Sequence, residues 1–216
     1  MNKKHTITMF SVPPLMVFEY KGDMNKILEY TSSIEYLQEG YARSKDDYIL
    51  DDENLKDLKD FCLDCVHEYV KEVVNIDEEI GLQQSWVNLS QPGENQNGDH
   101  YHPNSFVSGV FYIFSDQEKG APIKFKSDLH KSNFGAIQGD YLHFQYYPKD
   151  RHTYCPSNSA EFTYPSIPGQ LLLFSSTITH MVPKNMSDQK RMSIAFNTYP
   201  KLPFGNKLGL TYLRGG

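Results

Sequence analysis

Two histidines separated by one residue are the first side chains in this sequence whose types and spacing could bind a metal ion. His100 and His102 lie in the segment GENQNGDHYHPNS, which is rich in turn-forming residues and leads into an apolar run. Side chains at positions i and i+2 of an extended chain point to the same face, so both imidazoles can bind one cation. A pair of exposed loop histidines is the simpler alternative.

A third histidine and an arginine later in the chain favour the metal interpretation. His180 follows the apolar run PGQLLLFSSTIT, and a buried imidazole at that place needs a polar partner. Arg191 and Ser193 share one face of the next apolar segment, RMSIAFN. Because a guanidinium keeps its charge, Arg191 must meet an anion. That anion is either a protein carboxylate or a ligand carboxylate to which Ser193 also donates.

The predicted secondary structure that must position these residues changes near Gly81 from mainly helices to strands. Before it, residues 23–38 and 52–75 carry apolar side chains at three- and four-residue steps, which predicts two helices. Two aspartates just before the second helix are placed to cap it. Residues 5–20 read as two short strands around Pro13–Pro14, which cannot donate to a ladder.

After Gly81 the pattern is that of consecutive strands. The predicted strands are 82–90, 105–114, 121–126, 140–147, 160–164, 169–175, 179–183 and 191–199. Strands without helices between them imply antiparallel sheets that close as a sandwich, barrel or jelly roll. We therefore expect one domain over 1–216, with an extension (1–80) packed on a core (81–200) and a tail (201–216). The irregular segment 127–160 is a candidate lid.

Composition and charge exclude several classes of protein. The 216 residues include 27 acidic and 21 basic side chains, a formal charge of −6, which disfavours a nucleic-acid partner. No apolar run reaches the roughly 18 residues of a membrane span, and no signal peptide is recognisable. Three cysteines without framework spacing suit a reducing compartment. We expect a cytoplasmic protein without a membrane partner.

In their order and spacing, these motifs resemble those of the iron(II)- and 2-oxoglutarate-dependent dioxygenases. Over residues 82–199 the chain is most similar to a family of uncharacterised oxygenases within that superfamily. The matching motifs are W-x-N at Trp86 and Asn88, HxHPxS from His100, SGxxY from Ser108, PGxLxLF from Pro168, H-x-V at His180, and R-x-S-x-x-FN from Arg191. The resemblance implies a mainly β fold with N-terminal α: a double-stranded β-helix, or jelly roll, buttressed by helices.

The resemblance also implies an oxidoreductase that uses Fe(II), 2-oxoglutarate and O₂. In such enzymes the 2-oxo acid chelates iron through its C1 carboxylate and keto oxygen. Arg191 and Ser193 would hold its other carboxylate, and Tyr112, on the strand after the histidine pair, is placed to reach the same acid. An unidentified substrate, such as a protein prolyl residue or a small molecule, would be hydroxylated with release of succinate and CO₂.

One feature departs from the family pattern. The chain contains no HxD or HxE, so the usual carboxylate ligand is absent from its expected place. Three alternatives stay open: His102 completes a set with His100 and His180, Asp99 turns in beside His100, or Asn104 pairs with His102. We favour the three-histidine set, which would leave iron more positive and strengthen its hold on an anionic 2-oxo acid.

The missing carboxylate keeps two other functions open. One is a non-oxidising metal-binding jelly roll that binds a small acid or sugar. The other is a cupin-type dioxygenase with three histidines and no 2-oxo acid, which would leave Arg191 and Ser193 unexplained. The tail over 201–216 packs either on the barrel or on a second subunit, so a homodimer is a further possibility.

Overall fold

Strands dominate the architecture, as the sequence pattern predicts. The computed structural model describes residues 4–9, 12–39, 41–95, 97–126, 161–205, 207–209 and 212–213. The strands are β1 (Lys4–Met9), β2 (Val12–Glu19), β3 (Tyr36–Glu39), β4 (Tyr41–Ser44), β5 (Ile80–Ser90), β6 (Val107–Phe114), β7 (Ile123–Lys126), β8 (Glu161–Tyr164), β9 (Gln170–Ser175), β10 (His180–Met181) and β11 (Arg191–Pro200). The helical elements are α1 (Met24–Ser33), α2 (Lys56–Tyr69), the 3₁₀ turns η1 (Ile49–Asp51) and η2 (Glu53–Leu55), and the π-helical turn η3 (Val70–Val74).

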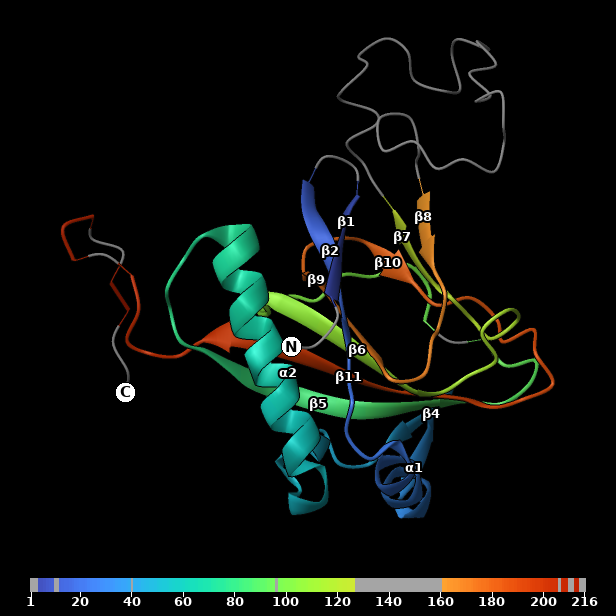
Figure 1. Cartoon of the computed structure of the whole chain (residues 1–216). Coiled ribbons are helices and arrows are strands. Elements are labelled where there is room, and N and C mark those ends of the chain that lie inside the picture. The colour runs from blue at the N-terminus through green and yellow to red at the C-terminus, as the bar shows by residue number, and fades with distance from the viewer. Residues whose placement is uncertain are drawn as a thin grey trace, which may run out of the picture.

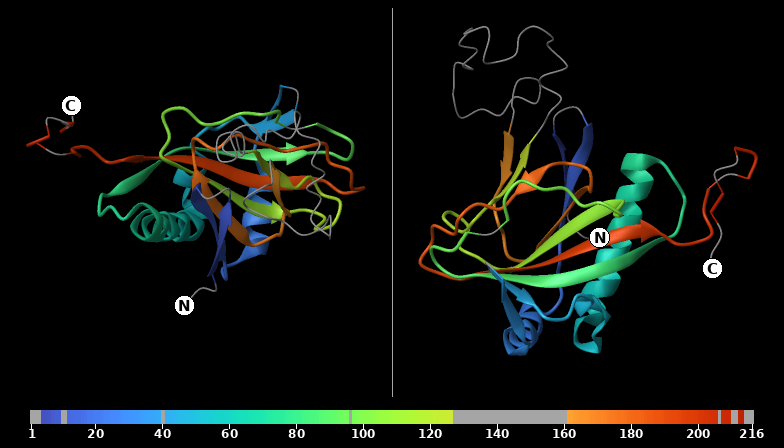
Figure 2. Two further views of the ribbon diagram at one scale, coloured as in Figure 1. Left: turned by 90° about the horizontal axis from the view of Figure 1, so that it is seen from above. Right: turned by 180° about the vertical axis from the view of Figure 1, so that it is seen from behind.

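Two antiparallel sheets form the jelly roll. Within the described part of the chain, the larger sheet has the order β1-β2-β9-β6-β11-β5-β4-β3 and the smaller has the order β10-β7-β8. The long strands β6, β11 and β5 lie side by side in the middle of the larger sheet (Figure 2). Strands from the N-terminal part of the chain therefore extend the same sheet that carries the core strands.

Alternation along the central strands separates two apolar clusters. On β9, Leu171 and Leu173 join the cluster that includes the buried residues of α2, while Leu172 and Phe174 join the cluster that includes the smaller sheet. Helix α2 lies across the outer face of the larger sheet (Figure 1). The larger sheet is thus covered by helices on one face and by the smaller sheet on the other, and the site must lie on the second face.

The two predicted helices are present with different ends. Helix α1 begins at its N-cap Asp23, whose carboxylate accepts from the backbone amides of the first turn, but it ends at Ser33 rather than continuing to residue 38. The Ser33 hydroxyl bonds back to the Tyr30 carbonyl, and the chain then becomes β3. Helix α2 begins only at Lys56, so Asp52 caps the preceding 3₁₀ turn instead.

Strands β3 and β4 were not predicted from sequence. Each spans four residues, and period-two alternation over so short a run is weak evidence for a strand. The predicted strand 140–147 and the whole of the candidate lid 127–160 lie outside the described residues. No helix in the described part of the chain is long and apolar enough to cross a membrane.

Candidate active site

Backbone pairing brings the three histidines together from two distant parts of the chain. The amide of His100 donates to the carbonyl of His180 at 3.0 Å, and the amide of His180 donates back at 2.8 Å. The amide of His102 donates to the carbonyl of Ser176 at 3.0 Å, just after β9. The loop that carries the histidine pair is therefore held against β9 and β10 by main-chain bonds.

The three imidazoles converge on one point. Their ligand nitrogens all lie within 4.8 Å of one another, and the Nε2 atoms of His102 and His180 face each other at 3.2 Å. The Nδ1 atoms of His100 and His180 lie 2.7 Å and 2.9 Å from the carbonyls of Gly98 and Ile178, to which they donate. A donating Nδ1 leaves the Nε2 lone pair free, which is the form in which imidazole binds a metal.

Burial keeps two of these imidazoles neutral. It lowers the pKa of His180 to about 3 and that of His102 to about 4, with smaller contributions from the neighbouring histidine charges. Both side chains are therefore unprotonated at neutral pH without a metal. Three neutral nitrogen donors around one point fit a divalent transition metal such as iron or zinc.

The two alternative metal ligands considered from sequence, Asp99 and Asn104, do not belong to the histidine cluster. Asp99 is exposed, and its carboxylate accepts from Lys126 Nζ at 2.6 Å. Asn104 is exposed and has a left-handed backbone with φ of 56°. Among the described residues, no Asp, Glu or Cys joins the three-histidine cluster.

Arg191 and Ser193 lie side by side behind the histidines, on the inner face of β11. Arg191 is only 1% exposed; its Nε donates to the Ala121 carbonyl at 3.0 Å and its Nη1 to Ser193 Oγ at 3.1 Å. Loss of hydration is the largest effect on this guanidinium and lowers its pKa. The predicted sharing of one strand face by these two residues is confirmed.

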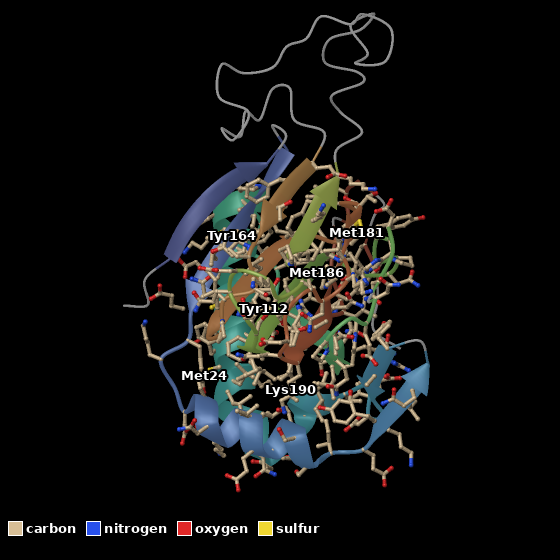
Figure 3. The ribbon with its side chains drawn as sticks, turned by 90° about the vertical axis from the view of Figure 1, so that its right-hand side faces the viewer. Met24, Tyr112, Tyr164, Met181, Met186 and Lys190 are labelled. Atoms are coloured by element: carbon tan, nitrogen blue, oxygen red, sulfur yellow. The ribbon has the colours of Figure 1, made fainter. Side chains whose placement is uncertain are left out.

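Tyr112 lies beside this pair rather than in the cavity. It is opposite Ser193 in the register of β6 and β11, near the middle of the molecule (Figure 3). Its ring centre is 5.1 Å from Arg191 Cζ, and its hydroxyl is buried without a hydrogen-bond partner in the described structure. Burial raises the pKa of Tyr112 above its usual value, and the nearby Arg191 charge lowers it by a smaller amount.

A narrow space, here called the inner cavity, joins these groups to the histidines. Its lining includes His180, Arg191, Ser193 and Asn88, and its volume is about 40 Å³. That volume holds a few water molecules. A five-carbon diacid therefore needs the lining side chains to move apart. The side-chain oxygen Oδ1 of Asn88 accepts from the Trp86 indole N–H at 3.2 Å. This bond orients the Asn88 carboxamide, which lines the cavity.

A chain of buried hydroxyls supports the loop that carries His102. Ser176 Oγ lies 2.7 Å from Ser105 Oγ and 2.8 Å from Ser108 Oγ. Ser108 in turn donates to Asn197 Oδ1 at 3.1 Å. These bonds connect β6 and β11 to the residue that follows β9, so the side-chain oxygen of Asn197 has a structural role.

On the solvent side of the histidines lies a second and wider space, here called the outer groove. It has a volume of about 1030 Å³. Its lining residues are Tyr41, Arg43, Tyr48, Gln83, Gln84, Trp86, Asn97, Gly98, Asp99, His100, His102, Pro103, Asn104 and Asn197. Most of these residues were not singled out from sequence, because neither β4 nor its packing beside β5 was predicted.

Comparison with known proteins gives a consistent result. A family model described as "Putative 2OG-Fe(II) oxygenase" matches residues 84–197, more than half of the 216 residues. That range contains all six residues of the predicted site. No curated protein matches the sequence.

Several solved structures share the fold. The epimerase SnoN from nogalamycin biosynthesis, described as non-heme and alpha-ketoglutarate-dependent, is 13% identical, with 86% of this chain and 78% of that chain covered and a TM-score of 0.58. HygX from Streptomyces hygroscopicus, with nickel and 2-oxoglutarate bound, is 14% identical, with coverage of 89% and 85% and a TM-score of 0.55. A Pseudomonas putida prolyl-4-hydroxylase is 12% identical, with coverage of 86% and 92% and a TM-score of 0.52.

Proposed function

This chain belongs to the "Putative 2OG-Fe(II) oxygenase" family, and from that premise we propose that it hydroxylates an organic substrate at a three-histidine iron centre. The enzyme is an oxidoreductase that uses Fe(II), 2-oxoglutarate and O₂. In the proposed reaction one oxygen atom of O₂ enters the substrate as a hydroxyl group. The other enters succinate, and CO₂ leaves from the 2-oxo acid.

The convergence of three imidazoles carries the metal part of this proposal. His100, His102 and His180 supply three nitrogens around one point, and two of these side chains are held neutral by burial. Asp99 stays with Lys126 in this arrangement. Bound Fe(II) would supply the position at which O₂ and the 2-oxo acid meet, and the protein would supply geometry and exclusion of water.

The polar pair on β11 supports the assignment of the 2-oxoglutarate site. Arg191 is a buried cation whose neighbour Ser193 offers a hydroxyl to the same ligand, and both line the cavity that reaches His180. A planar guanidinium binds a carboxylate with two parallel hydrogen bonds. The unpaired Tyr112 hydroxyl, beside Arg191, is placed to donate to the ligand once the cavity widens.

The descriptions of two structural neighbours are relevant to the substrate class of this chain. One neighbour is described as a prolyl-4-hydroxylase, and HygX is also described with hygromycin B bound, which supports both candidates. We keep a protein prolyl residue and a small molecule as the two candidate substrates of this chain.

Anaerobic titration of 2-oxoglutarate into the Fe(II)-loaded protein, followed by visible absorption, tests the proposed centre. We expect a metal-to-ligand charge-transfer band that saturates with 2-oxoglutarate, because the 2-oxo acid chelates the metal directly. His180→Ala should abolish the band.

A matched substitution of a histidine outside the site provides the control. His67 is exposed on α2, so His67→Ala should leave the band unchanged. Absence of the band in the native protein, together with tight binding of zinc, would contradict 2-oxo acid chelation at this site. It would favour the non-oxidising metal-binding domain instead.

A further inference from the structure

The outer groove opens directly onto the candidate metal centre. His100 and His102 line both the outer groove and the inner cavity, and Trp86 and Asn97 do so as well. The Trp86 ring lies 6.2 Å from the His102 ring. A molecule bound in the outer groove would therefore lie against the face of the centre that is opposite Arg191.

Three aromatic side chains line the outer groove. Tyr41 comes from β4, Tyr48 from the turn before η1, and Trp86 from β5. Tyr48 is 52% exposed, and the other two rings are half-buried. Such rings offer apolar faces at a wet surface and keep their polar atoms accessible to water or ligand. They suit a ligand that has an apolar face and a hydrated rim.

Neutral amides make up much of the remaining lining. The carboxamide side chains are those of Gln83, Gln84, Asn97, Asn104 and Asn197. Each carboxamide has two N–H donors and a carbonyl acceptor, and among these five the Asn197 oxygen already accepts from Ser108. A ligand that satisfies both kinds of atom must itself donate and accept hydrogen bonds, as hydroxyl groups do.

The charged side chains of the lining already have partners of opposite charge. Arg43 pairs with Asp47, four residues along the chain, and Asp99 pairs with Lys126. No other Lys, Arg, Asp or Glu is among the described residues that line the groove. A charged ligand would have to compete with these pairs, so the electrostatics favour an uncharged one.

We propose that the outer groove binds a neutral, polyhydroxylated ring of the pyranoside type as the substrate to be oxidised, an inference that rests on the proposed function. The C–H face of such a ring packs on Tyr48 or Trp86, because that contact removes apolar surface from water. Its hydroxyl groups exchange hydrogen bonds with the carboxamides. The ring edge then points toward His100 and His102.

A proline-rich peptide is the competing occupant. Prolyl rings also pack on exposed aromatic side chains. Prolyl residues, however, bring no N–H group. The carboxamide oxygens of the groove would then lose water without gaining a donor, which is unfavourable. The hydroxyl-rich ligand is the better match for this lining.

Trp86 is the single tryptophan of the chain and provides a direct readout of binding. The full chain, with and without Zn(II) and 2-oxoglutarate, would be titrated with the methyl glycosides of glucose, galactose and mannose while tryptophan fluorescence is recorded. Parallel titrations would use glucosamine, glucose 6-phosphate and a Pro-Pro-Gly repeat peptide. We expect a saturable change for at least one neutral glycoside, and weaker effects of the charged sugars and the peptide.

Substitutions of two exposed tyrosines distinguish binding in the outer groove from binding elsewhere on the surface. Tyr48→Ala should weaken glycoside binding about tenfold because a stacking face is lost. Tyr199→Ala should leave binding unchanged, since Tyr199 is also exposed but lies outside the groove. The same affinity in Tyr48→Ala as in the native chain would contradict the stacking role.

The outcomes distinguish this inference from the proposed function. If no neutral glycoside changes the fluorescence, or if the peptide or a charged sugar binds more tightly than every neutral glycoside, the substrate class is wrong. The charge-transfer band with 2-oxoglutarate would be unaffected by that result. If glycosides bind but the band is absent, the proposed oxygenase centre is wrong, and the groove remains a glycoside site.

Discussion

At the scale of single residues, three buried polar side chains belong to the proposed site. His180, Arg191 and Tyr112 are 4%, 1% and 0% exposed, in an interior that is otherwise largely apolar. Each costs free energy to bury, and a structural role accounts for that cost only where hydrogen bonds compensate it. The Tyr112 hydroxyl has no hydrogen-bond partner of good geometry in the described structure, and a ligand carboxylate held by the neighbouring Arg191 would give this hydroxyl an acceptor.

Tyr112→Phe should have opposite effects on stability and on ligand binding. Removal of an unpaired buried hydroxyl should raise the free energy of unfolding of the ligand-free protein, by roughly 1 kcal/mol. The affinity for 2-oxoglutarate should fall about five- to tenfold, because the ligand loses a donor. Urea unfolding and the anaerobic titration measure the two effects. A loss of stability in the variant would show that the hydroxyl is satisfied within the protein.

Arg191→Lys tests the guanidinium geometry while it keeps the positive charge. A lysine lacks the planar fork, so the affinity for 2-oxoglutarate should fall by about tenfold or more. Metal affinity should stay unchanged, since the guanidinium is not a ligand, and Co(II) titration followed by absorption provides that comparison. Equal 2-oxoglutarate affinity in the variant would assign the carboxylate to another cation.

At the scale of elements, the site depends on how the histidine loop is fixed to the sheets. The loop donates backbone hydrogen bonds to Ser176 and His180, and the hydroxyls of Ser105, Ser176 and Ser108 connect it to β6 and β9. The proposed ligand set therefore depends on contacts between segments that are far apart in the sequence. Changes beneath the loop should alter metal binding without touching a ligand.

Ser176→Ala should weaken both the fold and the metal site. Its hydroxyl contacts the buried Ser108 hydroxyl and the half-buried Ser105 hydroxyl, which would be left without this partner at a cost of about 1–3 kcal/mol. Metal affinity should also fall, because the Ser105 and Ser108 hydroxyls beside the histidine loop lose this link, even though the Ser176 carbonyl that accepts from the His102 amide stays in place. Ser115→Ala is the matched control: Ser115 Oγ lies 2.6 Å from Ser166 Oγ, so its loss should reduce stability and leave metal affinity unchanged.

Gly109 in β6 shows why the SGxxY motif has a glycine at that position. A Cβ atom added there would collide with the ring of Phe196, which is 1% exposed on the neighbouring strand β11. Gly109→Ala should therefore lower the free energy of unfolding by about 1–3 kcal/mol through overpacking. Phe196→Leu in the same chain should recover part of that loss, as a double-mutant cycle by urea unfolding would measure. Additive effects would contradict direct contact.

At the scale of the whole molecule, the three histidines join the two sheets. His180 belongs to β10 of the smaller sheet, while His100 and His102 precede β6 of the larger one. A metal held by all three would link segments that separate on unfolding. Metal binding should therefore be coupled to global stability.

Addition of Zn(II) should raise the melting temperature, and chelation should reverse the rise. At a free metal concentration of about 100 times Kd, the gain in stability should be about 2.7 kcal/mol, provided that the unfolded chain does not bind the ion. Differential scanning calorimetry measures the change. His180→Ala should remove most of the gain and His67→Ala should retain it. A similar gain in both variants would place the metal elsewhere.

The sequence by itself predicted the mainly β core and the shared strand face of Arg191 and Ser193, and both features follow from local periodicity, which a single chain displays directly. The six residues of the proposed site came instead from the histidine spacing and from the resemblance to a known family, and their roles stay a prediction. Only the tertiary structure decided that Asp99 pairs with Lys126, that three imidazoles converge, and that Tyr41 and Tyr48 form a groove with Trp86. These contacts join residues distant in sequence, and strand pairing and packing fix them rather than any local pattern.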